Sequence, residues 1–271
     1  MHMRADEIAA WLRERVSAAG ARGLVVGLSG GLDSAVVAGL CQMATPDLTI
    51  GVLLPCQSDP QDEADARLVA EHFRLATLRV DLEPAYEQLT ADLRAGLTRL
   101  AADREPNSSA SRGGLSSPGV EPAAMPADDL KARVPSANLK PRLRMSALYF
   151  VANSLNYLVA GTSNRCELTI GYFTKYGDGG ADVLPIGHLL KSEVRALARD
   201  LGVPELIAEK PPSAGLRAGQ SDEEDMGFTY ADLERYLTRG PDGVAPALAL
   251  RIERLIRQTD HKRAMPPIPG G

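Results

Sequence analysis

Gly23-Leu24-Val25-Val26-Gly27-Leu28 is an apolar run that leads into Ser29-Gly30-Gly31-Leu32-Asp33-Ser34, and a second apolar run, Ala35–Leu40, follows. This order predicts a strand, a tight glycine turn and the start of a helix. Adjacent glycines let backbone N–H groups come close to an anion, and the N-terminus of the next helix adds its positive end. The loop is therefore predicted to bind phosphate.

The loop differs from the ordinary P-loop, because it lacks the Gly-Lys-Ser/Thr ending whose lysine reaches the β- and γ-phosphates. An acid, Asp33, stands at that place. A bare carboxylate would repel a polyphosphate, so an acid is suitable here where it holds a magnesium ion that also binds phosphate oxygens. The pattern predicts a site for a nucleotide with Mg²⁺.

Short apolar runs alternate with segments of helical period, which predicts an α/β fold with a doubly wound, Rossmann-like parallel sheet flanked by helices. Strands are predicted near Leu24–Leu28, Thr49–Leu54, Ala76–Val80, Tyr157–Gly161 and Val183–Ile186. Helices are predicted at about 33–43, 60–73, 83–103, 139–156, 189–201, 229–238 and 245–260, after an amphipathic helix in Met1–Val16. The 271 residues are expected to form a single domain. Its ligands are expected at the carboxyl ends of the strands, where the glycine loop and the loop after Gly161 lie.

Two segments differ from this pattern. Residues 104–136 are rich in Ser, Gly and Pro, and they are predicted to be a mobile loop, interpreted as a surface insertion in preference to an active-site lid. Residues 209–227 combine Pro, Ser, Gly and acidic residues. We interpret them as a second active-site loop because they contain one of the motifs described below.

Composition narrows the class of protein. A net charge of −5 disfavours a nucleic-acid partner, and neither a membrane span nor a signal peptide is predicted. The three cysteines form no C-x-x-C pair and the four histidines have no metal-ligand spacing, so no disulfide framework or zinc site is predicted. A cytoplasmic protein is expected.

Four further segments follow the glycine loop in a characteristic order: Asn138–Met145 (NLKPRLRM), Gly161–Glu167 (GTSNRCE), Gly171–Asp182 (GYFTKYGDGGAD) and Lys210–Leu216 (KPPSAGL). The loop alone resembles the signature of the ATP pyrophosphatases, of the adenine nucleotide alpha-hydrolase-like superfamily. With these segments the chain resembles the NAD synthetases over about residues 5–82 and 138–263. Several spaced motifs are far more specific than a single glycine loop.

The resemblance implies an ammonia-dependent NAD synthetase, a ligase that forms a C–N bond in two steps. The nicotinate carboxylate of deamido-NAD attacks the α-phosphate of ATP and releases pyrophosphate, and ammonia then displaces AMP from the adenylate. Such a site must neutralise polyphosphate charge and align the reacting groups, and it needs no protein nucleophile. The resemblance also implies a homodimer, and the apolar face of the predicted 139–156 helix suits either core or interface.

The resemblance assigns roles to individual residues. Asp33, Glu167 and Lys191 would be catalytic, and Asp33 and Glu167 would hold Mg²⁺. ATP would contact Gly27, Leu28, Ser29, Gly30, Gly31, Leu32, Asp33, Ser34, Thr162, Lys191 and Ser213. Deamido-NAD would contact Arg142, Lys175, Asp182, His261 and Lys262. Structural alternatives stay open. Arg142 would form a salt bridge, and His261 and Lys262 would interact with the negative C-terminal end of the last predicted helix. Pro141 is expected to interrupt the start of its helix, which leaves the direction of Arg142 open.

Other functions stay open at this point. The chain is expected to lack the amidohydrolase domain of glutamine-dependent NAD synthetases, so free ammonia is the expected nitrogen source, with a separate glutaminase subunit as an alternative. Another ATP pyrophosphatase, GMP synthetase-like or tRNA-thiolating, is the nearest enzyme alternative. A nucleotide-binding sensor without turnover is the alternative from another class, and the joint presence of Asp33, Glu167 and Lys191 argues against it.

Overall fold

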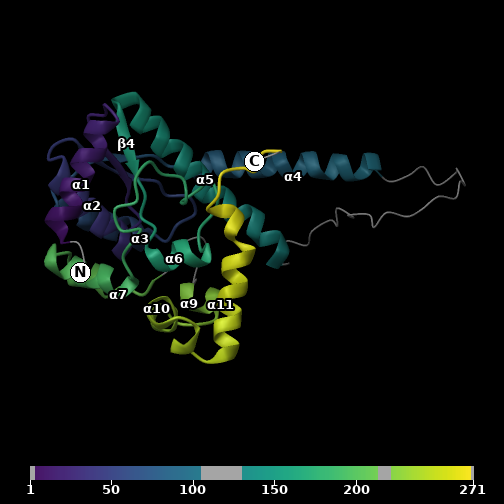
Figure 1. Ribbon diagram of the computed structural model, residues 1–271. Helices are drawn as coiled ribbons and strands as arrows, with labels where there is room; N and C mark the ends of the chain where they lie inside the picture. The colour runs from purple at the N-terminus through teal and green to yellow at the C-terminus, as the bar shows by residue number, and fades with distance from the viewer. Residues whose placement is uncertain (1–3, 105–129, 213–220, 270–271) are drawn as a thin grey trace, which may run out of the picture.

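A parallel sheet of four strands forms the centre of the computed structural model, which describes residues 4–104, 130–212 and 221–269 (Figure 1). The strands are β1 (Gly23–Gly27), β2 (Thr49–Leu53), β3 (Ala76–Arg79) and β4 (Tyr157–Ala160), in the spatial order β3-β2-β1-β4. Leu24 of β1 is paired with Thr49 of β2 on one side and with Leu158 of β4 on the other. These strands confirm the predicted α/β class and four of the five predicted strands.

The fifth predicted strand, Val183–Ile186, is wrong. Val183 forms one isolated parallel bridge, to Ala160, and no ladder follows it. Pro185 has no N–H to donate to a ladder, and the Gly187 N–H donates to the Leu184 carbonyl at 3.1 Å. The segment therefore turns directly after its first contact with the sheet.

Eleven α-helices occur in the described residues. They are α1 (Ala5–Ala18), α2 (Leu32–Ala44), α3 (Pro60–His72), α4 (Glu83–Arg104), α5 (Leu130–Leu155), α6 (Arg165–Ile170), α7 (Lys191–Asp200), α8 (Glu205–Ala208), α9 (Asp222–Met226), α10 (Tyr230–Arg239) and α11 (Pro246–Gln258). The long helices confirm the predicted ones to within a few residues, except at the start of α5. Helices α6, α8 and α9 have only six, four and five residues, too few for a period of 3.6 to be read from the sequence.

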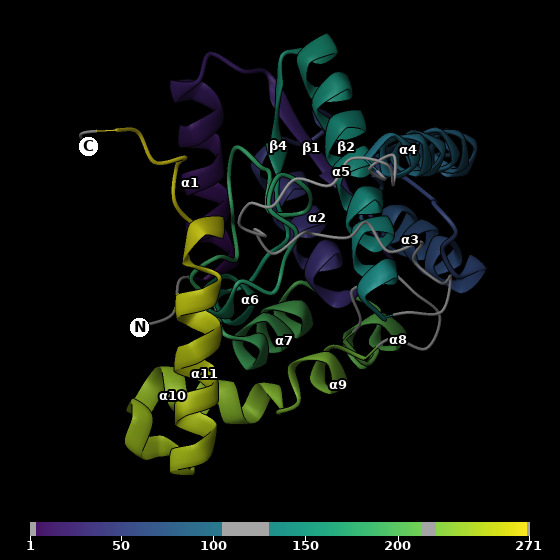
Figure 2. The same cartoon turned by 90° about the vertical axis from the view of Figure 1, so that its right-hand side faces the viewer.

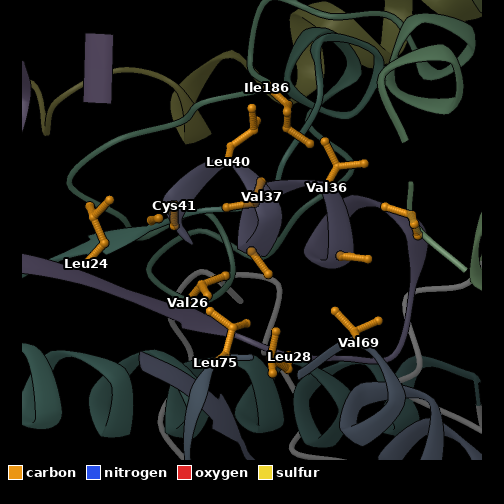
Figure 3. Packing of buried hydrophobic residues seen from close by; sticks show 14 of the residues in the cluster. Leu24, Val26, Leu28, Val36, Val37, Leu40, Cys41, Val69, Leu75 and Ile186 are labelled. Atoms are coloured by element: carbon orange, nitrogen blue, oxygen red, sulfur yellow. The ribbon is translucent and has the colours of Figure 1, made fainter. Parts of the chain in front are cut away.

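Helices cover both faces of the sheet, and β1 shows why. Its alternate residues Leu24 and Val26 pack into one buried cluster with side chains of α1, α2 and α3, as Figure 3 shows for Leu24, Val26, Val36, Leu40 and Val69. Val25 points to the opposite face, where it packs with Val52 and Ala152 of α5. A strand buried on both faces contains an unbroken apolar run, and each fully buried Leu or Val stabilises the fold by about 1.5–3 kcal/mol.

Helix α5 corrects two predictions. It begins at Leu130, so the loop predicted for residues 104–136 is wrong for residues 130–136, while residues 105–129 lie outside the described part of the chain. Pro135 and Pro141 lie inside the helix and do not start it. A proline removes one helical hydrogen bond, but packing of Leu139, Leu143 and Ala147 against the sheet cluster favours a continuous helix.

A third cluster lies beside the sheet and packs α6 against α10 and α11, the pair at the lower edge of Figure 2. Cys166 and Ile170 of α6 are buried there with Leu233 and Ile252. The predicted loop at 209–227 is helical at α9, and its residues 213–220 are outside the described ranges. No described helix is long and apolar enough to span a membrane.

Candidate active site

A cavity of about 290 Å³ opens beyond the carboxyl ends of β1, β2 and β4. Its walls include the glycine loop, the end of β2 at Leu53 and Leu54, and Gly161 and Thr162 after β4. Ligands of open parallel sheets bind at this edge, because the connecting loops diverge there. The structure therefore brings the predicted phosphate loop and the loop after Gly161 to one cavity.

The glycine loop is held by its own serines. The Ser29 hydroxyl donates to Ser34 Oγ at 3.0 Å, and the Ser34 hydroxyl is also within 2.9 Å of the Gly31 carbonyl. Gly30 has φ of +75°, and a Cβ there would lie 2.3 Å from the Asp62 carbonyl oxygen, so only glycine fits. Gly31, the N-cap of α2, provides no side-chain cap, which leaves the first N–H groups of α2 available to an anion in the cavity.

Asp33, Glu167 and Lys191 come from three separate segments and meet at the cavity wall. Lys191 Nζ lies 2.6 Å from Asp33 Oδ2 and 3.9 Å from Glu167 Oε1. The lysine side chain is 5% exposed, and each carboxylate side chain is 15% exposed. The lysine starts α7 and the aspartate lies in the first turn of α2, so the backbone directs both into the cavity.

Glu167 is held from both ends of its carboxylate. Its Oε2 accepts from the Asn164 N–H at 3.1 Å, and its Oε1 accepts from Asn164 Nδ2 at 2.8 Å, in a capping box at the start of α6. The same Asn164 amide donates to Asp33 Oδ2 at 3.3 Å, and the Tyr230 hydroxyl lies 3.3 Å from Glu167 Oε1. Asn164 thus bridges the two carboxylates.

The electrostatics of this group follow from burial. Burial and the charge of Asp33 raise the pKa of Glu167 well above its usual value, while Lys191 opposes that rise. For Lys191, burial lowers the pKa, but the charges of Asp33 and Glu167 outweigh it and the net shift is upward. Two carboxylates share one lysine here, and burial, together with the repulsion between them, favours the protonated form of Glu167 until a further cation arrives.

The two carboxylates fit a magnesium ion. Asp33 Oδ1 is buried without a hydrogen-bond partner, so one carboxylate oxygen is free to take a ligand. Mg²⁺ prefers oxygen ligands and is usually held by one or two carboxylates together with waters and substrate phosphates. Among the described residues no three His, Cys, Asp or Glu side chains are placed to hold a metal ion together, so a metal bound here would rely on that mixed coordination.

The residues predicted to contact deamido-NAD form a second group, beside the cavity and not in its wall. Arg142 Nε donates to the Lys175 carbonyl at 3.3 Å, and Lys175 Nζ donates to the His261 carbonyl. Lys262 Nζ donates at 2.8 Å to the carbonyls of Gly171 and Phe173. Among the described residues Arg142 forms no salt bridge. The alternative of the last helix's C-terminus fits His261, whose Nδ1 lies 3.1 Å from the carbonyl of Gln258, the last residue of α11, whereas Lys262 bonds the end of α6 instead.

Asp182 is tied to the sheet. Its Oδ2 accepts from the Val159 N–H at 2.8 Å, and its Oδ1 accepts from the Tyr149 hydroxyl of α5 at 3.0 Å. The hydrogen bond with Asp182 and burial raise the pKa of Tyr149 to about 12, with burial the larger cause. Asp182 is therefore fixed at the end of β4 and exposed to solvent.

Thr162, predicted to contact ATP, lines the cavity, whereas Ser213 lies outside the described residues. Several cavity residues were not predicted: Arg144, Lys210, Asp222 and, behind Glu167, Tyr230 and Asn164. Arg144, Asn164 and Lys210 stand inside the motifs quoted above, so motif membership was the available signal. Asp222 and Tyr230 approach the site only because α9 and α10 fold against α6, which no local pattern indicates.

Known proteins similar to this chain are mainly NAD synthetases. The family model described as NAD synthase matches residues 4–108 and 120–266. The NH(3)-dependent NAD(+) synthetase of Carboxydothermus hydrogenoformans is 46% identical, covering 97% of this chain and 96% of that protein. Among solved structures, the NMN synthetase of Francisella tularensis is 33% identical with a TM-score of 0.81, covering 98% of this chain and 97% of that one. The NH3-dependent NAD synthetase of Campylobacter jejuni is 27% identical with a TM-score of 0.70, covering 97% and 96%.

Proposed function

Because the chain belongs to the NAD synthase family, we propose that the cavity beyond β1, β2 and β4 is its active site. The protein is a ligase that uses ATP and ammonia to amidate deamido-NAD to NAD. The convergence of Asp33, Glu167 and Lys191 beside the glycine loop carries the proposal. Phosphoryl chemistry depends on positioning and on charge stabilisation, and this arrangement supplies both.

The glycine loop binds the ATP phosphates through backbone N–H groups. Residues Gly27 to Ser34 approach from the end of β1, Thr162 adds a hydroxyl from the other side of the cavity, and Ser213 would add a second hydroxyl. Lys191 stabilises the charge that develops on the leaving pyrophosphate when the α–β bond breaks. This requires Lys191 to exchange part of its contact with Asp33 for a phosphate oxygen.

We assign the two carboxylates, Asp33 and Glu167, to Mg²⁺. Bound there, the ion would neutralise phosphate charge and polarise the α-phosphate that the nicotinate carboxylate attacks. The buried, unpartnered Asp33 Oδ1 supports this assignment, and a cation there would offset the burial and repulsion that raise the pKa of Glu167. Asn164 and Tyr230 hold Glu167 in position for that contact.

Deamido-NAD is assigned to the second group, which adjoins the cavity through Pro141 and Tyr172. Arg142 and Lys175 present cations that suit a pyrophosphate, and Asp182 presents a carboxylate that suits a ribose hydroxyl. His261 and Lys262 are tied to the same 171–175 segment and complete this surface. The nicotinate carboxylate then enters the cavity toward the α-phosphate.

A second substrate deserves a test, because the Francisella tularensis relative is described as an NMN synthetase and has a TM-score of 0.81 with this chain. Nicotinate mononucleotide carries the same carboxylate as deamido-NAD and lacks only the adenylate half. Comparing kcat/KM for the two substrates decides the preference. A higher value for the mononucleotide would make it the physiological substrate.

We propose a homodimer in the cytoplasm. Leu89, Leu93, Leu97 and Leu100 lie along α4 at spacings of three or four residues and are 37–60% exposed, which is typical of an apolar face that awaits a partner. The three cysteines are free and buried, as suits a reducing compartment. Sedimentation equilibrium gives the mass, and a monomer at micromolar concentration would contradict the dimer.

The decisive assay supplies ATP, Mg²⁺, ammonium and deamido-NAD and measures NAD, AMP and pyrophosphate. Glu167→Gln and Asp33→Asn keep the shape of each side chain, and we expect each to retain the melting temperature and to lose pyrophosphate release about 100-fold or more. Terbium luminescence, a probe of the metal site, should weaken in both variants. Glu14→Gln on the exposed side of α1 is the charge-matched control. Normal pyrophosphate release by Glu167→Gln would exclude this cavity as the place of adenylation.

A further inference from the structure

Three cations line the cavity within the described residues: Arg144, Lys191 and Lys210. Lys191 is matched by Asp33 at 2.6 Å. Lys210 is matched twice, because its Nζ lies 2.9 Å from Asp62 Oδ1 and also contacts Asp65 Oδ2 at 2.5 Å. Two of the three cations therefore already have carboxylate partners.

Arg144 differs from both lysines. Its Nε donates to the Leu54 carbonyl at 3.1 Å, and its Nη2 donates to the Ser58 hydroxyl at 3.0 Å. Both acceptors are neutral, and among the described residues no carboxylate oxygen comes within 4.0 Å of the guanidinium. Asp62 and Asp178 act on its charge only from farther away.

The two tethers orient the guanidinium without neutralising it. Arginine has five N–H donors in a planar fork, so two bonds to Leu54 and Ser58 leave three donors for another partner. Arg144 is half-buried in the cavity wall, and burial lowers its pKa, because a guanidinium loses part of its hydration there. A partly desolvated charge without a carboxylate partner is costly to keep in a fold, and a bound anion would compensate it.

On the proposed function, we infer that Arg144 binds a phosphate oxygen of a substrate in this cavity, through the guanidinium donors that face away from Leu54 and Ser58. An anion of the substrate is favoured over a residue of the chain, because no carboxylate of the described residues lies within 4.0 Å of Arg144; Lys191 and Lys210 already have such partners. A planar fork suits two oxygens of one phosphate group. Two substrates carry that chemistry: the ATP triphosphate and the pyrophosphate of deamido-NAD.

Binding without turnover tests the inference and identifies the source of the phosphate. Calorimetric titration measures the Kd of Mg²⁺·ATP in the absence of deamido-NAD, and the Kd of deamido-NAD in the absence of ATP. We expect Arg144→Gln to raise one of the two Kd values about 10- to 100-fold. Whichever ligand loses affinity is the source. If both Kd values stay within about twofold of the unaltered protein, the inference is wrong.

Matched variants separate the charge from the fold. Arg144→Lys keeps the charge but loses the planar fork, so its Kd should lie between those of the unaltered protein and Arg144→Gln. If the Arg144→Gln protein does not fold, Arg144→Lys serves as the test variant in its place. Ser58→Ala removes one tether and should raise the same Kd only a few-fold.

Arg15→Gln removes an equal charge from the exposed side of α1 and should change neither Kd. An equal loss in Arg15→Gln would assign the effect to net charge and overturn the inference. Because these titrations need no catalysis, their failure is distinguishable from normal pyrophosphate release by Glu167→Gln, which would instead refute the proposed active site.

Discussion

A buried lysine, Lys191, and a half-buried one, Lys262, are held in opposite ways. Lys191 Nζ lies against the carboxylates of Asp33 and Glu167, whereas Lys262 Nζ donates to the carbonyls of Gly171 and Phe173. Burial lowers the pKa of Lys262, and the carbonyls do not compensate it, but the carboxylates around Lys191 reverse the effect of burial and raise its pKa.

The difference separates a lysine whose charge is available for a substrate phosphate from one whose hydrogen bonds hold two segments together. Lys191 lines the cavity and its partners are themselves candidate metal ligands, so its contacts can be exchanged when a phosphate arrives. Lys262 lies outside the cavity wall and fastens the 171–175 segment to the C-terminal residues. Variants of each region test whether this division holds.

The largest effect is expected from Lys191→Met. It removes the only cation within 4 Å of Asp33 and Glu167 in the described residues, and we expect kcat to fall about 100- to 1000-fold. Steady-state kinetics with pyrophosphate detection measures it, and thermal unfolding reports whether the fold survives the loss of the ion pair. A kcat within about threefold of the unaltered enzyme would remove Lys191 from the catalytic group.

The second largest effect is expected from Gly30→Ala. A Cβ at Gly30 would lie 2.3 Å from the Asp62 carbonyl oxygen at φ of +75°, and one at Gly171 would lie 2.3 Å from Thr259 Cβ at φ of +69°. Each change should destabilise the protein by about 2–3 kcal/mol, measured by urea unfolding. Only Gly30→Ala should also raise the KM of ATP. Gly20→Ala, at φ of +63° with open space around it, is the control for backbone strain alone and should cost about 1 kcal/mol.

Lys262→Met tests the other lysine of the comparison. It leaves two backbone carbonyls without their donor, so we expect a loss of about 1–3 kcal/mol in the free energy of unfolding and a kcat within about threefold of normal. The KM of deamido-NAD shows whether Lys262 also contacts substrate. An unchanged KM would remove Lys262 from the proposed deamido-NAD surface and leave it a purely structural residue. A rise without loss of stability would keep it on that surface and contradict the contrast with Lys191 drawn above.

Tyr149→Phe should have the smallest effect. It removes the hydroxyl that donates to Asp182 Oδ1 at 3.0 Å but keeps the Val159 tether, so Asp182 loses one of two constraints. We expect the KM of deamido-NAD to rise a few-fold, by about 0.5–1.5 kcal/mol in binding free energy, with the KM of ATP unchanged. Tyr157→Phe, at the start of β4, is the control hydroxyl deletion. A larger change in the KM of ATP would show that Asp182 faces the other substrate.

Much of the fold was predictable because its signals are local. A two-sided apolar strand, a glycine turn and a helix start follow one another in residues 23–40, and the α/β class, four strands and the longer helices followed from such patterns. The predicted strand Val183–Ile186 was wrong because its apolar residues pack in a turn after one bridge. The start of α5 was misplaced because Pro135 and Pro141 favour a break that packing on the sheet overrides.

In the candidate site too, some features follow from short segments of sequence and others from contacts between distant segments. By itself, the sequence determined the glycine loop, the acid at Asp33 and the motifs that contain Glu167 and Lys191, because residue type and spacing are properties of short segments. Only the tertiary structure decided that Asn164 bridges Asp33 to Glu167 and that Lys262 faces backbone carbonyls. It also decided that, in the described part of the chain, Lys191 has a carboxylate partner while Arg144 has only neutral ones. Charge pairing depends on which side chains approach within a few ångströms, and that distance is set by packing between segments more than 100 residues apart, such as Asp33 and Lys191.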